Sequence, residues 1–280
     1  MLTLGDFDID ALLDFAQSID SAYAVYPIKM KGKTRWIEAP NHSLMDLQRL
    51  LLHKLFYRIA PNECAHGFVR GKSIVSNAAA HVGKPWLVTL DIKDFFPSIS
   101  RQQVKTALEP HFAETCEADL VSKIVCRKEH LPQGAPTSPH LANLVFRPTD
   151  VKLAHHALDG EWTYTRYADD LTFSGNGNPQ EILRQVTTTI HEAGFNVSKR
   201  KTKIRSRHQR QVVTGLVVNQ KLGIPKPTRR RLRAAFHNAK KKGAEIDLNE
   251  LNQLHGQLSF AAFVDPLVYA QQRSDIAALV

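Results

Sequence analysis

Two adjacent aspartates, Asp169 and Asp170, lie between runs of aromatic and β-branched residues in the stretch YTRYADDLTFSG (164–175). Adjacent carboxylates repel one another, and burying either one unpaired is costly, so a divalent cation is the simplest compensation. A third acid, Asp91, ends the apolar run WLVTL (86–90), which is typical of a buried strand. Three carboxylate oxygens are hard ligands that suit Mg²⁺, and they leave positions in its coordination sphere for substrate phosphates. Two such ions would support phosphoryl transfer by activating an attacking hydroxyl and stabilising the leaving oxygen.

The elements that must position these acids follow from local patterns. Residues 162–167 and 171–174 are strand-like, which predicts a hairpin with the paired aspartates at its tip. Ser100 and Gln103 form a capping-box pattern ahead of a helix. One further strand is expected over 212–218. Other helices are expected over 41–60, stopped by Pro61; over 141–158, kinked or broken at Pro148; over 181–193, ended by Gly194; over 229–242, capped by Thr228 and closed by Gly243; and from about 248 onward.

Charge and composition restrict the class of protein. The 280 residues carry a net charge of +10, and the excess is concentrated in three basic segments, 199–210, 226–233 and 240–242. A basic face of this kind fits a polyanion such as nucleic acid, although a solvated surface would have the same composition. There is no long apolar run, no signal-peptide pattern and no close cysteine pair. We therefore expect no membrane partner, a cytoplasmic location and three reduced thiols.

Seven segments occur in an order that resembles the successive motifs of reverse transcriptases, over about residues 26–264. They are YPIKMKGKTRWIEAP, GFVRGKSI, LDIKDFFPSI, LPQGAPTSPHLANLV, YTRYADDLTFSG, GFNVSKRKTKI and VTGLVVNQK. The resemblance implies an α+β right-hand polymerase fold. Residues 1–84 would form helix-rich fingers with a short acidic N-terminal segment. Residues 85–220 would form a palm with an antiparallel sheet and a fingers insertion around 105–135, and residues 221–280 a helical thumb that binds RNA or duplex.

The resemblance also implies the metal chemistry. Asp91 and Asp169 would ligate two Mg²⁺ ions, for which Mn²⁺ could substitute, with Asp170 in support and the Ile92 carbonyl as an additional ligand. Lys201 would be the general acid that protonates the leaving pyrophosphate. Its neighbours Lys199 and Lys203 remain alternatives for that role.

Residues from four motifs would hold the incoming nucleotide by the same resemblance. Phe96 occupies the position of the sugar gate, where an aromatic ring leaves no room for a 2′-hydroxyl, so deoxynucleoside triphosphates are the expected substrates. The backbone amides at 94–95 would face the triphosphate, and Lys31 and Lys33 remain alternatives to Lys29 in the fingers. The full nucleotide-binding set is Lys29, Arg35, Arg70, Asp94, Phe95, Phe96, Gln133 and Gly134.

Two shorter segments, NAAAH (77–81) and VTG (213–215), resemble the signatures of bacterial retron reverse transcriptases. Such enzymes copy part of a cognate structured noncoding RNA into multicopy single-stranded DNA, primed from a guanosine 2′-hydroxyl of that RNA. As a family they act in anti-phage defence with an effector protein, expected here to be encoded nearby. The residues expected to contact RNA or template are Asn77, His81, Val213, Thr214, Gly215, Arg229, Arg230 and Arg233.

Two alternative functions remain. The first is another bacterial reverse transcriptase, either group II intron-like, for which we expect too little chain after the thumb, or of the abortive-infection type, which the intact QGAPTSP segment disfavours. The second is an RNA-binding scaffold with secondary polymerase activity. The three acids argue against a scaffold, because carboxylates without metal would repel phosphates.

Overall fold

The computed structural model describes residues 1–30, 33–243 and 246–278. At its centre lies a four-stranded antiparallel sheet with the strand order β4-β5-β3-β6. Its strands are β3 (Trp86–Asp91), β4 (Trp162–Tyr167), β5 (Asp170–Gly175) and β6 (Lys203–Ser206). The expected strand before Asp91 and the expected hairpin at the paired aspartates are therefore confirmed.

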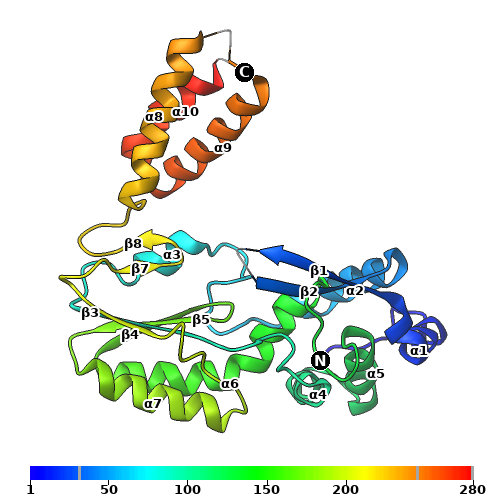
Figure 1. The fold of residues 1–280 in the computed structure, drawn as a ribbon. Helices are drawn as coiled ribbons and strands as arrows, with labels where there is room; N and C mark the ends of the chain where they lie inside the picture. Colours follow the sequence, from blue (N-terminus) through cyan, green and yellow to red (C-terminus); the bar gives the residue numbers. More distant parts are fainter. Residues whose placement is uncertain (31–32, 244–245, 279–280) are drawn as a thin grey trace.

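Both faces of this sheet are covered. Figure 1 shows α6 (Ser138–Asp159) and α7 (Pro179–Glu192) below the sheet, and α3 (Ile74–Ala79) with the β7–β8 hairpin above it. Successive strand residues point to opposite faces, so Val88 and Leu90 join the main core while Leu87 joins a second apolar cluster with Ala78. The acid-bearing ends of β3 and β5 are thus held by two separate apolar layers.

Helix α6 continues through Pro148 and is not broken there. Proline removes a helical hydrogen bond, but buried residues on both sides of it, including Phe146 and Leu153, anchor the helix to the core. Burial thus outweighs the local preference of the proline to break the helix.

A helix-rich lobe lies at the end of the sheet where the acids are (Figure 1). It contains an antiparallel hairpin and four helices, with the expected Ser100–Gln103 capping box present at the start of one of them. Helix α2 ends at Lys54, earlier than expected, because a 3₁₀ turn over Phe56–Arg58 follows it and Phe56 is buried there. The elements are α1 (Ile9–Ser18), β1 (Tyr23–Met30), β2 (Lys33–Pro40), α2 (His42–Lys54), α4 (Arg101–Leu108) and α5 (Thr115–Val125).

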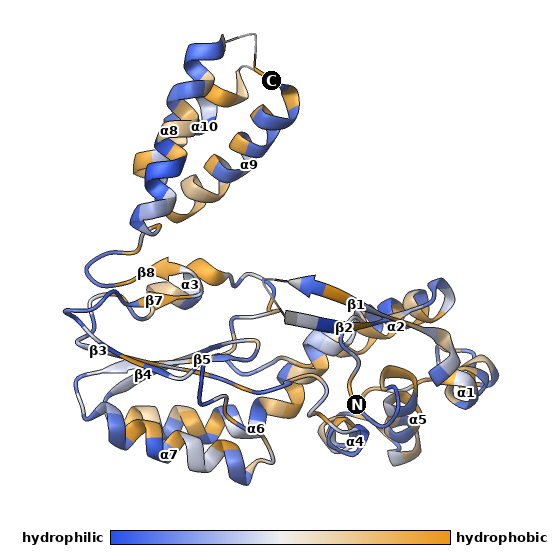
Figure 2. Ribbon diagram, viewed as in Figure 1, coloured by the Kyte–Doolittle hydropathy of each residue, from blue (hydrophilic) through white to orange (hydrophobic). Residues whose placement is uncertain are grey.

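A three-helix lobe ends the chain and consists of α8 (Lys226–Lys242), α9 (Leu248–Val264) and α10 (Pro266–Ala277). Figure 2 shows α8 as largely hydrophilic, while its buried Leu232 and Ala239 face the other two helices. The expected cap at Thr228 is wrong: the helix begins at Lys226, three residues earlier than expected, with Pro225 as the N-cap and no side-chain cap. Gly243 closes the helix as expected, with a φ of 53°.

The prediction of one continuous strand over 212–218 is also wrong, because a hairpin of two shorter strands forms there. Two short strands, β7 (Val212–Val213) and β8 (Leu216–Val217), pair across a turn at Thr214 and Gly215, whose φ angles are 45° and 85°. Positive φ at both central residues defines the tight turn that suits a two-residue hairpin. Within the described part of the chain, no helix is long and apolar enough to cross a membrane.

Candidate active site

Strand pairing brings the three acids to one end of the sheet. Asp91 is the register partner of Asp170, and Asp169 lies in the two-residue turn between β4 and β5. The Ile92 amide donates a hydrogen bond of 2.9 Å to the Asp169 carbonyl, which ties the turn to the end of β3. A turn at this point resolves the problem of adjacent acids in a strand, since side chains there no longer alternate strictly between faces.

The acids differ in their surroundings. Asp91, which is 5% exposed, and Asp169 both line a cleft of about 750 Å³, whereas Asp170 begins β5 and is not among the described residues that line it. Burial, and then the charge of Asp91, raises the pKa of Asp169. Desolvation, with smaller contributions from the charges of Asp169 and Asp91, raises the pKa of Asp170 to about 6 although part of its surface is exposed. Like charges therefore gather here without full compensation.

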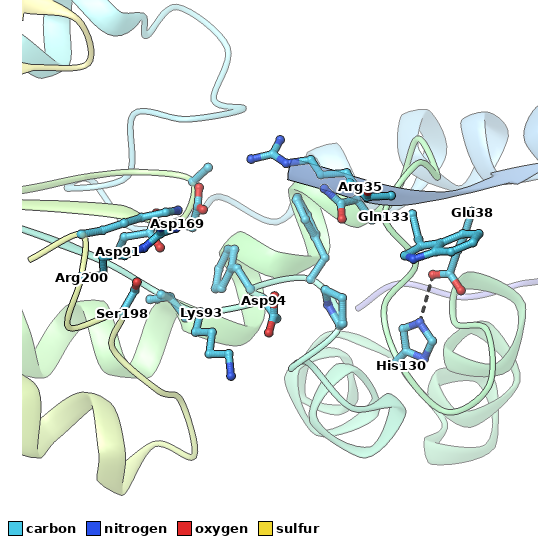
Figure 3. A pocket seen from close by; sticks show the side chains of 18 of the residues that line it. Arg35, Glu38, Asp91, Lys93, Asp94, His130, Gln133, Asp169, Ser198 and Arg200 are labelled. Carbon is cyan, nitrogen blue, oxygen red and sulfur yellow. Dashed lines mark hydrogen bonds and ion pairs between the residues drawn. The ribbon is translucent and has the colours of Figure 1, made fainter. Parts of the chain in front are cut away.

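This cleft collects most of the expected site residues (Figure 3). Four others, Lys29, Arg70, Gly134 and Asp170, are not among the described residues that line it, and the alternative Lys31 lies outside the described residues. The expected residues that line the cleft are Arg35, Asp91, Ile92, Asp94, Phe95, Phe96, Gln133, Asp169 and Lys201. Lining residues that we did not expect include Trp36, Glu38, Phe68, Lys93, His130, Ser198 and Arg200.

Lys201 forms an ion pair with Asp91. The Lys201 side chain is 39% exposed, whereas that of Asp91 is only 6% exposed. The alternatives Lys199 and Lys203 are not among the described residues that line the cleft. Of the three lysines, Lys201 lines the cleft and pairs with Asp91, while the charge of Lys203 acts on Asp170.

Three phenylalanines form one wall of the cleft. The ring of Phe96 lies 5.7 Å from that of Phe95 and 6.2 Å from that of Phe68. Phe95 is buried and also packs edge-on against Phe146 of α6, so Phe96 is supported from behind. Asp94, with a φ of 48°, makes the sharp turn that presents this wall.

A cluster not foreseen from the sequence ties the β1–β2 hairpin to the loop that carries Gln133. Glu38 accepts hydrogen bonds from Arg127 and from His130, the latter at 2.9 Å, and its amide donates to the Gln133 carbonyl at 2.9 Å. Burial alone would raise the pKa of Glu38, but the hydrogen bonds from His130 and Arg127 outweigh it and hold that pKa below its ordinary value. Figure 3 shows the hydrogen bond between His130 and Glu38, both of which line the cleft.

Gly134, expected to contact the nucleotide, is not among the described residues that line the cleft and lies against β2. A Cβ at this position would lie 2.8 Å from the Glu38 carbonyl oxygen and 2.9 Å from a methyl carbon of Ile37. Its φ of 143° is also one that side chains disfavour. The glycine lets the loop approach β2 closely enough to bring Gln133 into the cleft.

The carboxylates of Asp91 and Asp169 in the cleft fit a divalent cation whose remaining coordination positions are filled by water and substrate oxygens. Among the described residues, no three His, Cys, Asp or Glu side chains lie close enough together to form a protein-only metal site. Mg²⁺, however, is usually held by one or two carboxylates together with waters and substrate phosphates. Asp91 and Asp169 share one cleft, and burial first and the charge of Asp91 second raise the pKa of Asp169; a cation bound by the two carboxylates would offset both effects.

The two signature segments meet above the sheet, and half of their residues are buried. His81 is 0% exposed, and its two ring nitrogens contact Ser174 Oγ at 2.7 Å and Thr165 Oγ1 at 2.8 Å. Burial, together with smaller effects from the charges of His66 and Lys84, lowers the pKa of His81 to about 3. The hydroxyl of Thr214 donates to the Ile74 carbonyl at 3.0 Å, which joins the two segments.

This burial corrects part of the expected RNA-binding set. Asn77 and Val213, each 1% exposed, and His81 have almost no surface to offer, so the expectation that they contact RNA directly is wrong for this conformation. Their place is in the packing between α3, the sheet and the β7–β8 hairpin. Gly215 and the three α8 arginines, Arg229, Arg230 and Arg233, are exposed.

Comparison with known proteins agrees with this geometry. Residues 27–233 match the family described as reverse transcriptase (RNA-dependent DNA polymerase). The retron Mx162 reverse transcriptase of Myxococcus xanthus is 34% identical, over 90% of this chain and 60% of that protein. The retron Ec86 reverse transcriptase of Escherichia coli is 31% identical, over 92% of this chain and 81% of that protein. The chain thus spans only about 60% of the length of the Myxococcus relative.

Among solved structures, apo telomerase from Candida tropicalis superposes with a TM-score of 0.56 at 10% identity, over 92% of this chain and 58% of that one. At this identity the likeness concerns the fold alone, and it confirms the expected α+β right-hand polymerase fold. The match to the family over most of the chain, together with the Escherichia coli relative, establishes kinship. The chain therefore belongs to the reverse transcriptases, and among them to the bacterial retron reverse transcriptases.

Proposed function

We propose that this protein is an RNA-directed DNA polymerase that copies part of a cognate structured noncoding RNA into multicopy single-stranded DNA. Synthesis starts from a guanosine 2′-hydroxyl of the RNA, and the product belongs to an anti-phage defence system with an effector protein encoded nearby. The observation that carries the polymerase assignment is the meeting of Asp91 and Asp169 in one cleft, with the cationic side chains of Arg35 and Lys201 also lining it. Kinship with retron reverse transcriptases supports the RNA-templated product.

Asp91 and Asp169 are the residues that would hold two Mg²⁺ ions, or Mn²⁺ in their place, with Asp170 and the Ile92 carbonyl in support. When bound, the ions supply charge stabilisation of the attacking and leaving oxygens in phosphoryl transfer. Lys201, already paired with Asp91, is positioned to give a proton to the departing pyrophosphate.

The other residues lining the cleft select and orient the nucleotide. Arg35, on β2, meets the triphosphate from the side opposite the acids, and Gln133 contacts the nucleotide or template from the same side. Phe96, supported by Phe95 and Phe68, excludes a 2′-hydroxyl and so favours deoxynucleotides. Lys29 and Arg70 remain proposals for triphosphate binding that require movement of the fingers, since neither is among the described residues that line the cleft.

RNA and duplex product would contact the three-helix lobe. Arg229, Arg230 and Arg233 are exposed on α8 and none of them has an acidic partner among the described residues. Arginines of this kind bind backbone phosphates, which position nucleic acid without reading its sequence. We propose residues 1–84, 85–220 and 221–280 as fingers, palm and thumb.

The test is to express the protein from its native operon, purify it, and sequence the nucleic acid that copurifies. The sequencing is done before and after treatment with ribonuclease and debranching enzyme. The Asp169→Asn/Asp170→Asn variant, which keeps side-chain size, is the matched control. A discrete single-stranded DNA joined to RNA, present only with the parent protein, is the expected result. DNA synthesis retained by the variant would refute the metal-site assignment, and RNA without DNA in both samples would favour a scaffold.

A further inference from the structure

A fully buried arginine, Arg166, lies three residues before Asp169 on strand β4. Its guanidinium forms a two-pronged ion pair with Asp150 of α6, with Nε at 2.9 Å and Nη2 at 2.6 Å from the two carboxylate oxygens. The remaining nitrogen, Nη1, donates to the Asn143 side-chain oxygen at 2.9 Å and to the Ala168 carbonyl at 3.1 Å. One face of the guanidinium lies 4.8 Å from the centre of the Phe146 ring.

The Ala168 carbonyl belongs to the turn that carries Asp169, and this turn is strained. Ala168 has a φ of 56°, a left-handed conformation that residues with a Cβ disfavour and that persists only when its surroundings enforce it. A glycine would adopt this conformation freely. Something besides local preference must therefore hold the turn in place.

The loop that carries Gly67 packs directly against the turn, and Asn143 and Arg166 link the loop to the turn. On one side, Gly67 approaches so closely that a Cβ there would lie 2.4 Å from the Ala168 amide nitrogen. The Asn143 amide donates to the Gly67 carbonyl at 2.9 Å while its oxygen accepts from Arg166. Arg166 and Asn143 thus join the strained turn on one side to the Gly67 loop on the other.

A buried ion pair is weak evidence for a role in stability, because an apolar pair of similar volume often serves as well. Here, however, the guanidinium has a nitrogen left over after pairing with Asp150, and that nitrogen bonds the turn. Arginine suits this task because its planar fork of donors fixes several acceptors at once, which a lysine ammonium does not.

We propose that Arg166 is a positioning residue that holds Ala168 in its left-handed conformation and thereby sets the place of Asp169. The inference rests on the proposed polymerase function for its consequence in DNA synthesis, but the conformational part stands without it. The Ile92 amide reports the turn directly, because its hydrogen bond goes to the Asp169 carbonyl.

The experiment compares the full-length parent chain with three variants. Arg166→Lys keeps the positive charge beside Asp150 and loses the fixed donor to Ala168. Arg166→Lys/Ala168→Gly adds a residue that adopts positive φ without strain. Tyr164→Phe is the matched control, since it removes a different hydrogen bond to Asp150, one of 2.8 Å, and leaves the turn untouched. For each protein, hydrogen exchange at the Ile92 amide is measured without metal. Mn²⁺ half-saturation, primer–template binding and the rate of single-nucleotide extension on an RNA template are then measured.

For Arg166→Lys we expect Ile92 exchange to accelerate at least tenfold and the Mn²⁺ concentration for half-saturation to rise. The extension rate should fall about 10²-fold, the loss typical of a reacting group displaced by about 1 Å. Primer–template binding should stay within about twofold. In the double variant, slow exchange and at least tenfold of the lost rate should return, while Tyr164→Phe should match the parent.

Two results would overturn the proposal. One is parental Ile92 exchange in Arg166→Lys, which would mean that the turn does not need the arginine. The other is a double variant no better than Arg166→Lys, which would mean that Arg166 only fills the core. A parent chain that makes no DNA would refute the proposed function instead, while Ile92 exchange would still decide the conformational role.

Discussion

Replacing Asp170 by asparagine should stabilise the metal-free protein at neutral pH. The folded chain holds three carboxylates at one end of the sheet, and desolvation with the charges of Asp169 and Asp91 raises the pKa of Asp170 to about 6 from its usual 3.8. An acid whose pKa is higher in the folded than in the unfolded state destabilises the fold wherever it is ionised in both. Asparagine keeps the shape of the side chain and removes that charge.

The size and pH range of the gain follow from the same values. A difference of about two pKa units corresponds to about 3 kcal/mol at full effect, and solvent screening of the partly exposed Asp170 reduces this to about 1 kcal/mol. Below about pH 4 the acid is protonated in both states, so the variant should gain nothing. The gain should grow between about pH 4 and pH 6 and be complete above pH 6, because the folded parent must then carry the charge.

Urea unfolding of parent and variant at several pH values between 3.5 and 8, without divalent metal, measures this gain as a change in the free energy of unfolding. The range extends to either side of the window from about pH 4 to about pH 6 in which the gain should develop. Asp94→Asn, which removes the charge of a carboxylate that lines the cleft with Asp91 and Asp169, reports the effect of net charge alone. A gain in Asp170→Asn that does not vary with pH, or a loss of stability at pH 8, would refute a raised pKa of Asp170 in the folded state.

Two further substitutions test the cleft walls. Phe96→Ala should raise ribonucleotide insertion relative to deoxynucleotide insertion at least tenfold, because the ring that blocks the 2′-hydroxyl is gone; single-nucleotide insertion with both substrates measures this, and an unchanged ratio would remove Phe96 from sugar selection. Gly134→Ala should lower the free energy of unfolding by about 2–4 kcal/mol, since it adds both an unfavourable φ and a backbone clash at 2.8 Å. Gly83→Ala, with a φ of 76° and open space around its Cβ, should cost only about 1 kcal/mol, so equal losses in denaturant unfolding would show that the clash is absent.

The chemistry of the site could be predicted from the sequence because it lies in short, strongly patterned segments. The apolar run before Asp91 and the two β-rich runs around Asp169 each specify a strand, and strand ends carry the acids. The turn at Thr214 and Gly215 was within reach too, since a glycine between two apolar pairs is a hairpin signal. It was missed because the apolar residues on both sides suggested one continuous strand.

Other parts depend on contacts between segments far apart in the chain. Glu38 meets Arg127 and His130 only after the helix-rich lobe has folded, and nothing near Glu38 in the sequence marks it as their partner. The interior position of His81 is similar, because its partners Ser174 and Thr165 come from two strands that follow it by more than eighty residues. A polar signature thus suggested an RNA contact where tertiary packing makes a core hydrogen-bond network.

The structure holds the turn between β4 and β5 by its backbone and leaves the carboxylates of Asp169 and Asp170 without an ion pair among the described residues. The Asp169 carbonyl is bound by the Ile92 amide and the Ala168 carbonyl by Arg166, so the position of the acids does not depend on their own charge. Changing a carboxylate to an amide should therefore alter charge and metal affinity while the turn stays in place. Changing Arg166 should move the turn while the charges of the acids remain. Because these two kinds of substitution separate geometry from charge, comparing them shows how much of the site's chemistry each supplies.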